Sequence, residues 1–380
     1  MAQKIFTHNF ILCFFAQFTF SSVFHILIPT LPIYLSKSGS SEVEIGVLVG
    51  VLGVSSLVLR PIVGRGLIKI PEKNFMIAGT LIFALTSIAY LWATPFWPFL
   101  MVRIFQGIGL AFFYTASVTL ITNISPVTRR GQSISYFYLA FNISFALSPS
   151  LGMFLINNFS FTPLFLFCLG LSLCALFFTT RLGRGEVESL EGLPDQDQSF
   201  LSREALPIAL MSFFAHIVWG ALTAFFPLYA IEKGVANPGY FFAAYASVII
   251  LGRVLGGKIL DLYSKERVIL PCLFTYIISM TLLAFSETLP MFILVAVIWG
   301  IGNAFLMPSL VTYTLDRAGS SRGPAIGTLT AIGDLGIALG PVIMGIILRL
   351  TSYPIMFLCL TLTGIINLTY FYFFVREKNR

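Results

Sequence analysis

The acidic side chain with the clearest chemical potential lies in the middle of a long apolar segment. Residues 325–350 form a run long enough to cross a bilayer, and Asp334 lies near its centre. A carboxylate at that depth costs about 3 kcal/mol on insertion scales, so its presence indicates a function such as binding and releasing a proton. Gly340 and Pro341 follow closely, and there the segment can approach a neighbour or bend.

Two further side chains are candidates for the same proton-coupling and transport site. His216, in the apolar segment 206–231, lies at a depth comparable to that of Asp334, and an imidazole changes its charge near neutral pH. Asn142 is the neutral counterpart of Asp334 in the internal repeat described below. Both polar groups, like Asp334 itself, could instead make a permanent hydrogen bond that only holds helices together.

A cationic side chain also lies inside an apolar segment. Arg103 does not lose its proton in proteins, so it must be paired or hydrated. Its candidate partners are His25 and Gln17, both in the first apolar segment, and the substrate or water on the lipid side. Arg103 could bond to the carbonyl groups of that segment and hold the bundle together. A part in proton coupling is what the family resemblance described below implies for it.

Composition places the chain among membrane proteins. It has 380 residues, of which 57% are hydrophobic and 10% are charged, whereas soluble domains carry about 25% charged residues. The net charge of +7 is assigned to loops, and no nucleic-acid partner is expected. Twelve segments are long and apolar enough to span a bilayer: 9–35, 44–66, 74–94, 97–122, 133–157, 161–181, 206–231, 238–262, 266–286, 289–313, 325–350 and 352–375.

The two halves of the sequence repeat one another at an offset of 192 to 195 residues. Gly107 matches Gly300, Arg129 matches Arg322, and Pro149 matches Pro341. We therefore predict an all-α protein with two pseudo-symmetric six-helix bundles, at 1–181 and 206–380, joined by a polar cytoplasmic linker at 182–205. Such repeats usually form a site between the bundles near the midplane of the membrane.

Orientation follows from the positive charges. With both termini in the cytoplasm, seventeen Lys and Arg residues fall on the cytoplasmic side and three on the other side. The short loops favour a bacterial inner membrane. Trp92, Trp97 and Trp299 lie near segment ends and are expected to form an interfacial belt.

The motifs and the repeat together resemble the major facilitator superfamily. The run from Arg103 to Gly109 is similar to a motif of its fourth helix, and Gly257 to Asp261 is similar to its loop between helices 2 and 3. Ser148 to Gly152 resembles the Gly-Pro-x-x-Gly motif of the drug/proton antiporter branch, with Ser148 in place of the first glycine. Pro149 and Pro341 could then bend their helices during transport, and Gly107 and Gly340 could permit close packing.

The resemblance also implies a cytoplasmic latch. Asp261, with Gly257 before it, would pair with Arg129 and Arg130 at the start of the fifth helix. The copy in the first half follows Gly64 but has an isoleucine at the acidic position, so we expect the latch to be charged on one side only. Alternatively, Asp261 is a loop charge that only fixes topology.

The function implied is a secondary active transporter, not an enzyme. It would export a small amphipathic organic molecule in exchange for protons, as a monomer surrounded by membrane lipids and without a cofactor. No nucleotide-binding motif of the form Gly-x-x-x-x-Gly-Lys-Ser/Thr occurs in the sequence. The alternatives are an importer or uniporter of sugars or organic anions with Arg103 as a ligand, a lipid-handling carrier on the same fold, and a membrane enzyme.

Overall fold

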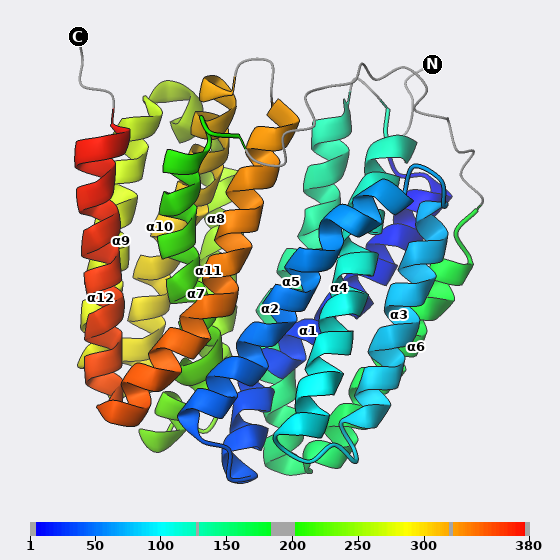
Figure 1. Ribbon diagram of the computed structural model, residues 1–380, viewed down its shortest axis with the longest axis horizontal. Helices are drawn as coiled ribbons and strands as arrows, with labels where there is room; N and C mark the ends of the chain where they lie inside the picture. The colour runs from blue at the N-terminus through cyan, green and yellow to red at the C-terminus, as the bar shows by residue number, and fades with distance from the viewer. Residues whose placement is uncertain (1–4, 127–128, 184–201, 319–321, 377–380) are drawn as a thin grey trace. The chain divides into compact units, whose positions relative to one another are not determined.

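All regular elements in the described part of the chain are helices (Figure 1). The computed structural model describes residues 5–126, 129–183, 202–318 and 322–376, and within these ranges the side chains of 131, 254–261 and 322–323 are not described. The prediction of an all-α fold is confirmed, and most of the predicted helix ends fall within a few residues of the observed ones. The predicted linker lies mainly outside the described residues.

The chain divides into two compact units, which are described separately. The first comprises Met1–Ser40 and Val51–Gly192, and the second comprises Ser41–Gly50 and Leu193–Arg380. Six helices precede residue 184: α1 (His8–Lys37), α2 (Glu42–Gly66), α3 (Glu72–Ala89), α4 (Trp97–Ile124), α5 (Arg130–Asn158) and α6 (Phe161–Thr180). The others are α7 (Leu206–Glu232), α8 (Gly239–Leu262), α9 (Lys265–Ala284), α10 (Leu289–Arg317), α11 (Arg322–Leu350), α12 (Tyr353–Tyr370) and the short π-helix η2 (Phe371–Val375).

Local sequence signals begin the first two helices. Thr7 precedes α1, and its hydroxyl accepts a hydrogen bond from the backbone N–H of Phe10 at 3.2 Å. Ser41 precedes α2 and forms a capping box with Glu44: the Ser41 backbone N–H donates to the carboxylate at 2.7 Å, and the Glu44 N–H donates to the Ser41 hydroxyl at 3.4 Å. The apolar runs that follow supply the rest of each helix.

In the first unit α1 packs against α5 and α6, and α3 packs against α4 and α6. Glycine permits the closest approach between α2 and α4, because a Cβ atom at Gly107 would lie only 1.9 Å from the hydroxyl of Ser55. Phe20, Phe83 and Phe113 fill the space between α1, α3 and α4, with ring centroids of Phe20 and Phe113 3.9 Å apart.

In the second unit α11 lies along α7, as Figure 1 shows, and α9 packs against α10 and α12. Three glycines of α11 face α7 and form what we call the glycine seam: Gly333, Gly336 and Gly340. A Cβ atom would lie 2.4 Å from the carbonyl oxygen of Phe213 at Gly336, and 2.5 Å from that of Ile217 at Gly340. The two backbones therefore touch along the seam, where no other residue type would fit without movement.

The tryptophan prediction is correct for exposure at two positions and wrong at the third. Trp92 and Trp97 are 75% and 69% exposed, as expected of side chains at a membrane interface. Trp299 is fully buried and stacks on Tyr245 at 4.2 Å and on Trp219 at 5.6 Å between ring centroids. It lies well inside α10 on the side that faces α7 and α8, and proximity to a segment end does not reveal that orientation.

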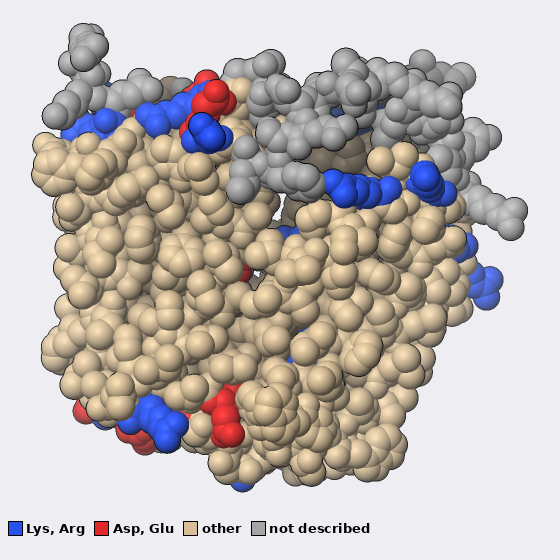
Figure 2. Space-filling view, viewed as in Figure 1, with Lys and Arg blue, Asp and Glu red and all other residues tan. Residues whose placement is uncertain are grey.

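Ten of the described helices are long and apolar enough to cross a membrane. The two helices outside this group are α3, whose first turn is polar, and α8, whose described apolar part runs over Gly239–Arg253. On the face shown in Figure 2, most charged side chains of the described residues in each unit lie near helix ends, and few are visible over the helix middles. This distribution is the one expected of a protein in a bilayer.

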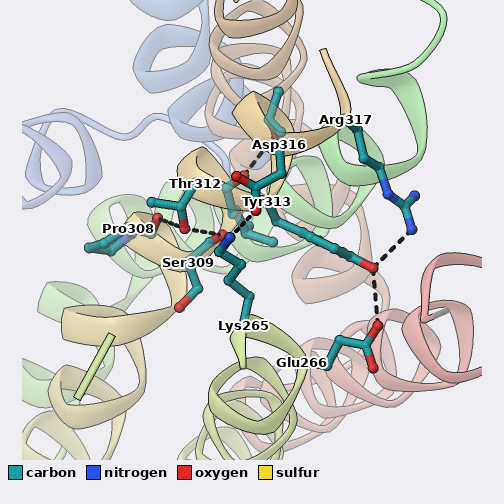
Figure 3. Close-up of polar contacts among 10 residues, drawn as sticks. Lys265, Glu266, Pro308, Ser309, Thr312, Tyr313, Asp316 and Arg317 are labelled. Atoms are coloured by element: carbon teal, nitrogen blue, oxygen red, sulfur yellow. Dashed lines mark hydrogen bonds and ion pairs between the residues drawn. The ribbon is translucent and has the colours of Figure 1, made fainter. Parts of the chain in front are cut away.

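Charged side chains join three helix ends of the second unit, in what we call the charged end cluster (Figure 3). Lys265 at the start of α9 forms an ion pair with Asp316 near the end of α10. Arg317 donates to the hydroxyl of Tyr313 at 2.9 Å, and both side chains bond to the carbonyl oxygen at the end of η2. The cluster consists of Lys265, Glu266, Tyr313, Asp316, Arg317, Val375 and Arg376.

Candidate functional site

The contact between α7 and α11 brings two of the predicted site residues together. His216 on α7 faces the glycine seam, and a Cβ atom at Gly333 would lie 2.9 Å from its Nδ1 atom. The missing side chain at Gly333 therefore makes room for the imidazole. Asp334 is the next residue of α11, and its negative charge acts electrostatically on His216. Both side chains are half-buried.

The hydrogen bonds of His216 define which ring nitrogen can take up a proton. Nδ1 lies 2.7 Å from the carbonyl oxygen of Ser212 and 3.1 Å from its hydroxyl. A carbonyl oxygen can only accept, so Nδ1 carries the hydrogen and Nε2 is the atom available to bind a second proton. Asp334 and His216 are thus the two groups at this contact whose chemistry allows them to exchange a proton.

Arg103 of the first unit is buried and bonds to its own helix. Its Nη1 atom donates to Oε1 of Gln106 at 2.7 Å, and the hydroxyl of Tyr90 donates to the same oxygen at 2.5 Å. The expected partners were His25 and Gln17 on α1. The spacing of three residues along α4 places Gln106 beside Arg103, and this proximity was the sequence signal that could have indicated the pair.

The two residues expected beside Arg103 have other partners. Nδ1 of His25 lies 2.7 Å from the hydroxyl of Ser144 on α5, which itself donates to a backbone carbonyl one turn earlier. The amide of Gln17 donates to Ser21 at 2.8 Å, and Ser21 bonds to the hydroxyl of Tyr114 on α4 at the same distance. These serine and tyrosine partners were missed, because their type and position differ little from those of many other polar residues in the apolar segments.

Other predicted site residues lie on helices that pack within one unit. Asn142 is half-buried on α5, two residues before Ser144. Pro149 lies inside the same helix. Pro341 lies inside α11, and its ring would be 2.9 Å from a Cβ atom at Gly220 of α7. Whether either proline bends its helix during transport stays a prediction.

The latch residues are described only in part. The side chains of Gly257 and Asp261 lie outside the described residues. Arg129 and Arg130 are exposed at the start of α5. Gly64 is exposed near the end of α2, where a Cβ atom would meet nothing within 4 Å. The charged latch therefore stays a prediction.

A family model named Major Facilitator Superfamily matches residues 13–261 and 208–380. The chain belongs to this family. Like other members it is a multi-pass membrane transporter, in agreement with its apolar helices. The observed repeat of six helices in each half of the sequence is the architecture that the resemblance implied.

Several curated proteins of the superfamily are similar over most of their length. The staphylopine export protein of Staphylococcus aureus is 26% identical over 358 residues, covering 89% of each chain. Multidrug resistance protein 2 of Bacillus subtilis is 25% identical and covers 87% of each chain. Among solved structures, the nucleoside transporter NupG matches with a TM-score of 0.80 and 14% identity, covering 98% of this chain and 100% of that one. At that identity the structural match shows the fold alone.

Proposed function

We propose that this protein is a proton-coupled exporter of small amphipathic organic molecules that works by alternating access. The observation that carries the proposal is the placement of Asp334 beside His216 along the glycine seam. Relatives over nearly the whole chain include a staphylopine export protein and multidrug resistance proteins, which supports export as the direction. We further propose a bacterial inner membrane with both termini in the cytoplasm, and a monomer as the working unit.

In the proposed cycle, the pair acts as the proton carrier. Asp334 and Nε2 of His216 take up a proton when the site is open to the side of higher proton concentration, and the pair then loses its net negative charge. A pair without net charge costs less free energy in the low-dielectric interior while the site changes from facing one side to facing the other. On the other side, water or substrate solvates Asp334, the proton leaves, and the carboxylate is ready for the next cycle.

The first experiment counts protons. Purified protein in unbuffered detergent is shifted between about pH 5 and pH 9, the range in which an imidazole and a coupled carboxylate titrate. Wild type is expected to release about one proton more than Asp334→Asn, because the amide cannot ionise. Glu287→Gln is the control for a surface acid, since its carboxylate is largely exposed and bonds to Lys233 at 2.9 Å. Coinciding traces for wild type and Asp334→Asn would end the proposed role of this residue.

Transport is then measured in proteoliposomes, with ethidium as a probe for a flat organic cation. An imposed pH gradient is expected to drive dye accumulation by wild type and not by Asp334→Asn. Exchange of dye without a pH gradient should persist in the variant, since the scaffold is intact. His216→Gln keeps a hydrogen-bonding side chain but cannot bind the proton. It should therefore also exchange dye without a pH gradient and fail to accumulate dye when the gradient is imposed. Accumulation driven by the pH gradient in both variants would contradict proton coupling at this site.

A further inference from the structure

A groove on the outer surface of the second unit lies between α9 and α10. Its cavity volume is about 300 Å³. Pro271 and Thr275 of α9 line one side, and Ile301 and Phe305 of α10 line the other. The floor includes Gly302, where a Cβ atom would lie 1.9 Å from the hydroxyl oxygen of Thr275. The absence of a side chain at this glycine lets the two helices meet and leaves the groove open above them.

The groove opens on a surface of apolar side chains. Ile301 is 46% exposed, and Phe274 and Ile278 on the neighbouring part of α9 are also exposed. In a membrane-spanning helix such a surface faces hydrocarbon chains. Thr275 donates its hydroxyl hydrogen to a carbonyl of its own helix, so the polar atom of the groove is already satisfied. The walls therefore suit a flexible hydrocarbon chain.

One end of the groove carries a positive charge. Arg267 and Tyr263 line it there, and both are exposed. In the described part of the chain, Arg267 has no ion pair or side-chain hydrogen bond, whereas nearby Lys265 is paired with Asp316 and Arg376 lies 3.5 Å from Glu266. The positive charge of Arg267 is thus available to a ligand, unlike that of its neighbours.

This end of the groove also lies at the level of the membrane surface. Arg267 is in the first turn of α9 and follows Lys265 and Glu266 of the charged end cluster, and charged side chains gather where helices leave the hydrocarbon core. From Arg267 to Thr275 the helix rises about 12 Å, so the groove runs from the headgroup region into the apolar core. A tyrosine at such a boundary typically contacts both regions.

We infer that this groove binds one anionic phospholipid, with an acyl chain between α9 and α10 and the headgroup phosphate at Arg267. The inference rests on the proposed orientation in the membrane and not on the proposed transport activity. Positive charge complementary to the headgroup, and an apolar channel leading from it, together match the two chemically distinct parts of a lipid. The cytoplasmic leaflet, where the positive charges place this end, attracts such residues through its anionic lipids.

Native mass spectrometry of the purified protein tests the headgroup assignment. The protein is titrated with phosphatidylglycerol and with phosphatidylcholine of the same acyl chains. Wild type is expected to bind one phosphatidylglycerol molecule about fivefold more tightly than phosphatidylcholine, the preference expected from one arginine near an anionic headgroup. Arg267→Gln should abolish this preference, and Arg267→Lys should restore most of it.

The matched control is Arg349→Gln, which removes an exposed arginine at the opposite end of the unit. It should leave the preference unchanged. If Arg267→Gln keeps the preference, or if Arg349→Gln loses it equally, the headgroup assignment is overturned. Each variant is first compared with wild type by size-exclusion chromatography and thermal unfolding, and Arg267→Lys keeps the test informative if the glutamine variant unfolds.

Photolabelling tests the position of the acyl chain. A phosphatidylglycerol with a diazirine in its acyl chain is bound, irradiated and mapped by peptide mass spectrometry. Labels should fall on peptides of α9 and α10 around Thr275 and Ile301. Ile301→Trp, which fills the mouth of the groove from an already exposed position, should reduce that labelling several-fold. Labelling spread evenly over the lipid-facing helices, or unchanged by Ile301→Trp, would overturn the assignment to this groove.

Discussion

Gln106 is the residue on which a buried charge of the first unit depends. Its Oε1 atom accepts hydrogen bonds from both Arg103 and Tyr90. Its amide nitrogen is buried and has no partner in the described part of the chain. An oxygen is therefore needed at this position, whereas the second polar atom of the side chain is not used.

Two replacements of Gln106 distinguish the contribution of its oxygen from that of its nitrogen. Gln106→Leu should lower the free energy of unfolding by about 1–3 kcal/mol, because it leaves two buried donors without their shared acceptor. Thermal unfolding in detergent measures the change. Gln106→Glu is the matched variant: it keeps the acceptor, removes the unused donor and adds a charge opposite to that of Arg103, so it should retain or raise stability. Equal losses in the two variants would show that the bond to Oε1 is not what matters.

For single residues, the position of a side chain along its apolar segment was easier to predict from the sequence than its hydrogen-bond partners. The depth of Asp334 and His216 in their segments could be estimated by counting residues from the segment ends, and the structure places both at the contact between α7 and α11. The partners of Arg103 could not be predicted, because a long side chain in an apolar segment can reach its own helix or several neighbours. Packing decides among these partners.

The glycine seam is the feature that matters most at the level of helices. Along it α7 and α11 meet backbone to backbone, and the space beside Gly333 holds the imidazole of His216. Small residues at this spacing are the usual way in which helices approach closely in membranes, where no hydrophobic driving force brings them together. The seam therefore fixes the position of the proposed proton site.

An added methyl group on the seam should disturb both packing and transport. In Gly340→Ala the new Cβ atom would lie 2.5 Å from the carbonyl oxygen of Ile217, so the helices must separate, at a cost of about 1–3 kcal/mol. The control is Gly327→Ala on the same helix, where nothing lies within 4 Å and the greater helix propensity of alanine should stabilise by up to about 1 kcal/mol. Melting temperature and dye transport report the two effects. A neutral Gly340→Ala would contradict the close contact.

Helix boundaries were predictable because twenty apolar residues can only be buried in a bilayer as a helix. The face that each helix turns inward was harder to predict, as Trp299 demonstrates. A helix that is apolar on all sides carries no periodic signal that distinguishes its lipid-facing side from its buried side. Glycine spacing indicated the seam, but the sequence did not specify which neighbouring helix would meet it.

At the scale of the whole molecule, the charge bias predicts how the chain lies in the membrane. We introduce single cysteines into a cysteine-free background at Ala236, before α8, and at Ser264, before α9. Both positions are exposed, and Ser264 makes no side-chain capping bond that the substitution could remove. In intact cells a membrane-impermeant maleimide should label position 236, and position 264 should react only after permeabilisation.

Permeabilised cells control for accessibility, since both positions should then react. The reverse pattern in intact cells would invert the orientation and place the lipid groove in the outer leaflet of that membrane. Labelling at both positions in intact cells would mean that α8 does not span the bilayer. The experiment thus tests the positive-inside prediction independently of any transport assay.

Membership of a transporter superfamily could be predicted from the sequence at this scale, because the repeat and several motifs extend over the whole chain. The boundary between the bundles was predicted at a polar linker, while contacts divide the chain so that Ser41–Gly50 belongs with the second unit. The composition of α2 does not reveal that its two parts belong to different units. Its polar and apolar residues are the same whichever neighbours its two parts contact.

The charged end cluster has a consequence for the order in which the protein is made. The carbonyl oxygen of Val375 accepts a hydrogen bond from Arg317 at the end of α10, and Arg376 lies close to Glu266 at the start of α9. Both of these helices leave the ribosome much earlier. Those earlier segments can become helical during synthesis, but this end of the unit cannot close until Val375 and Arg376 have been added. A chain released before Val375 would lack the carbonyl that Arg317 and Tyr313 share. This end of the second unit therefore closes only after α12 and η2 have been made.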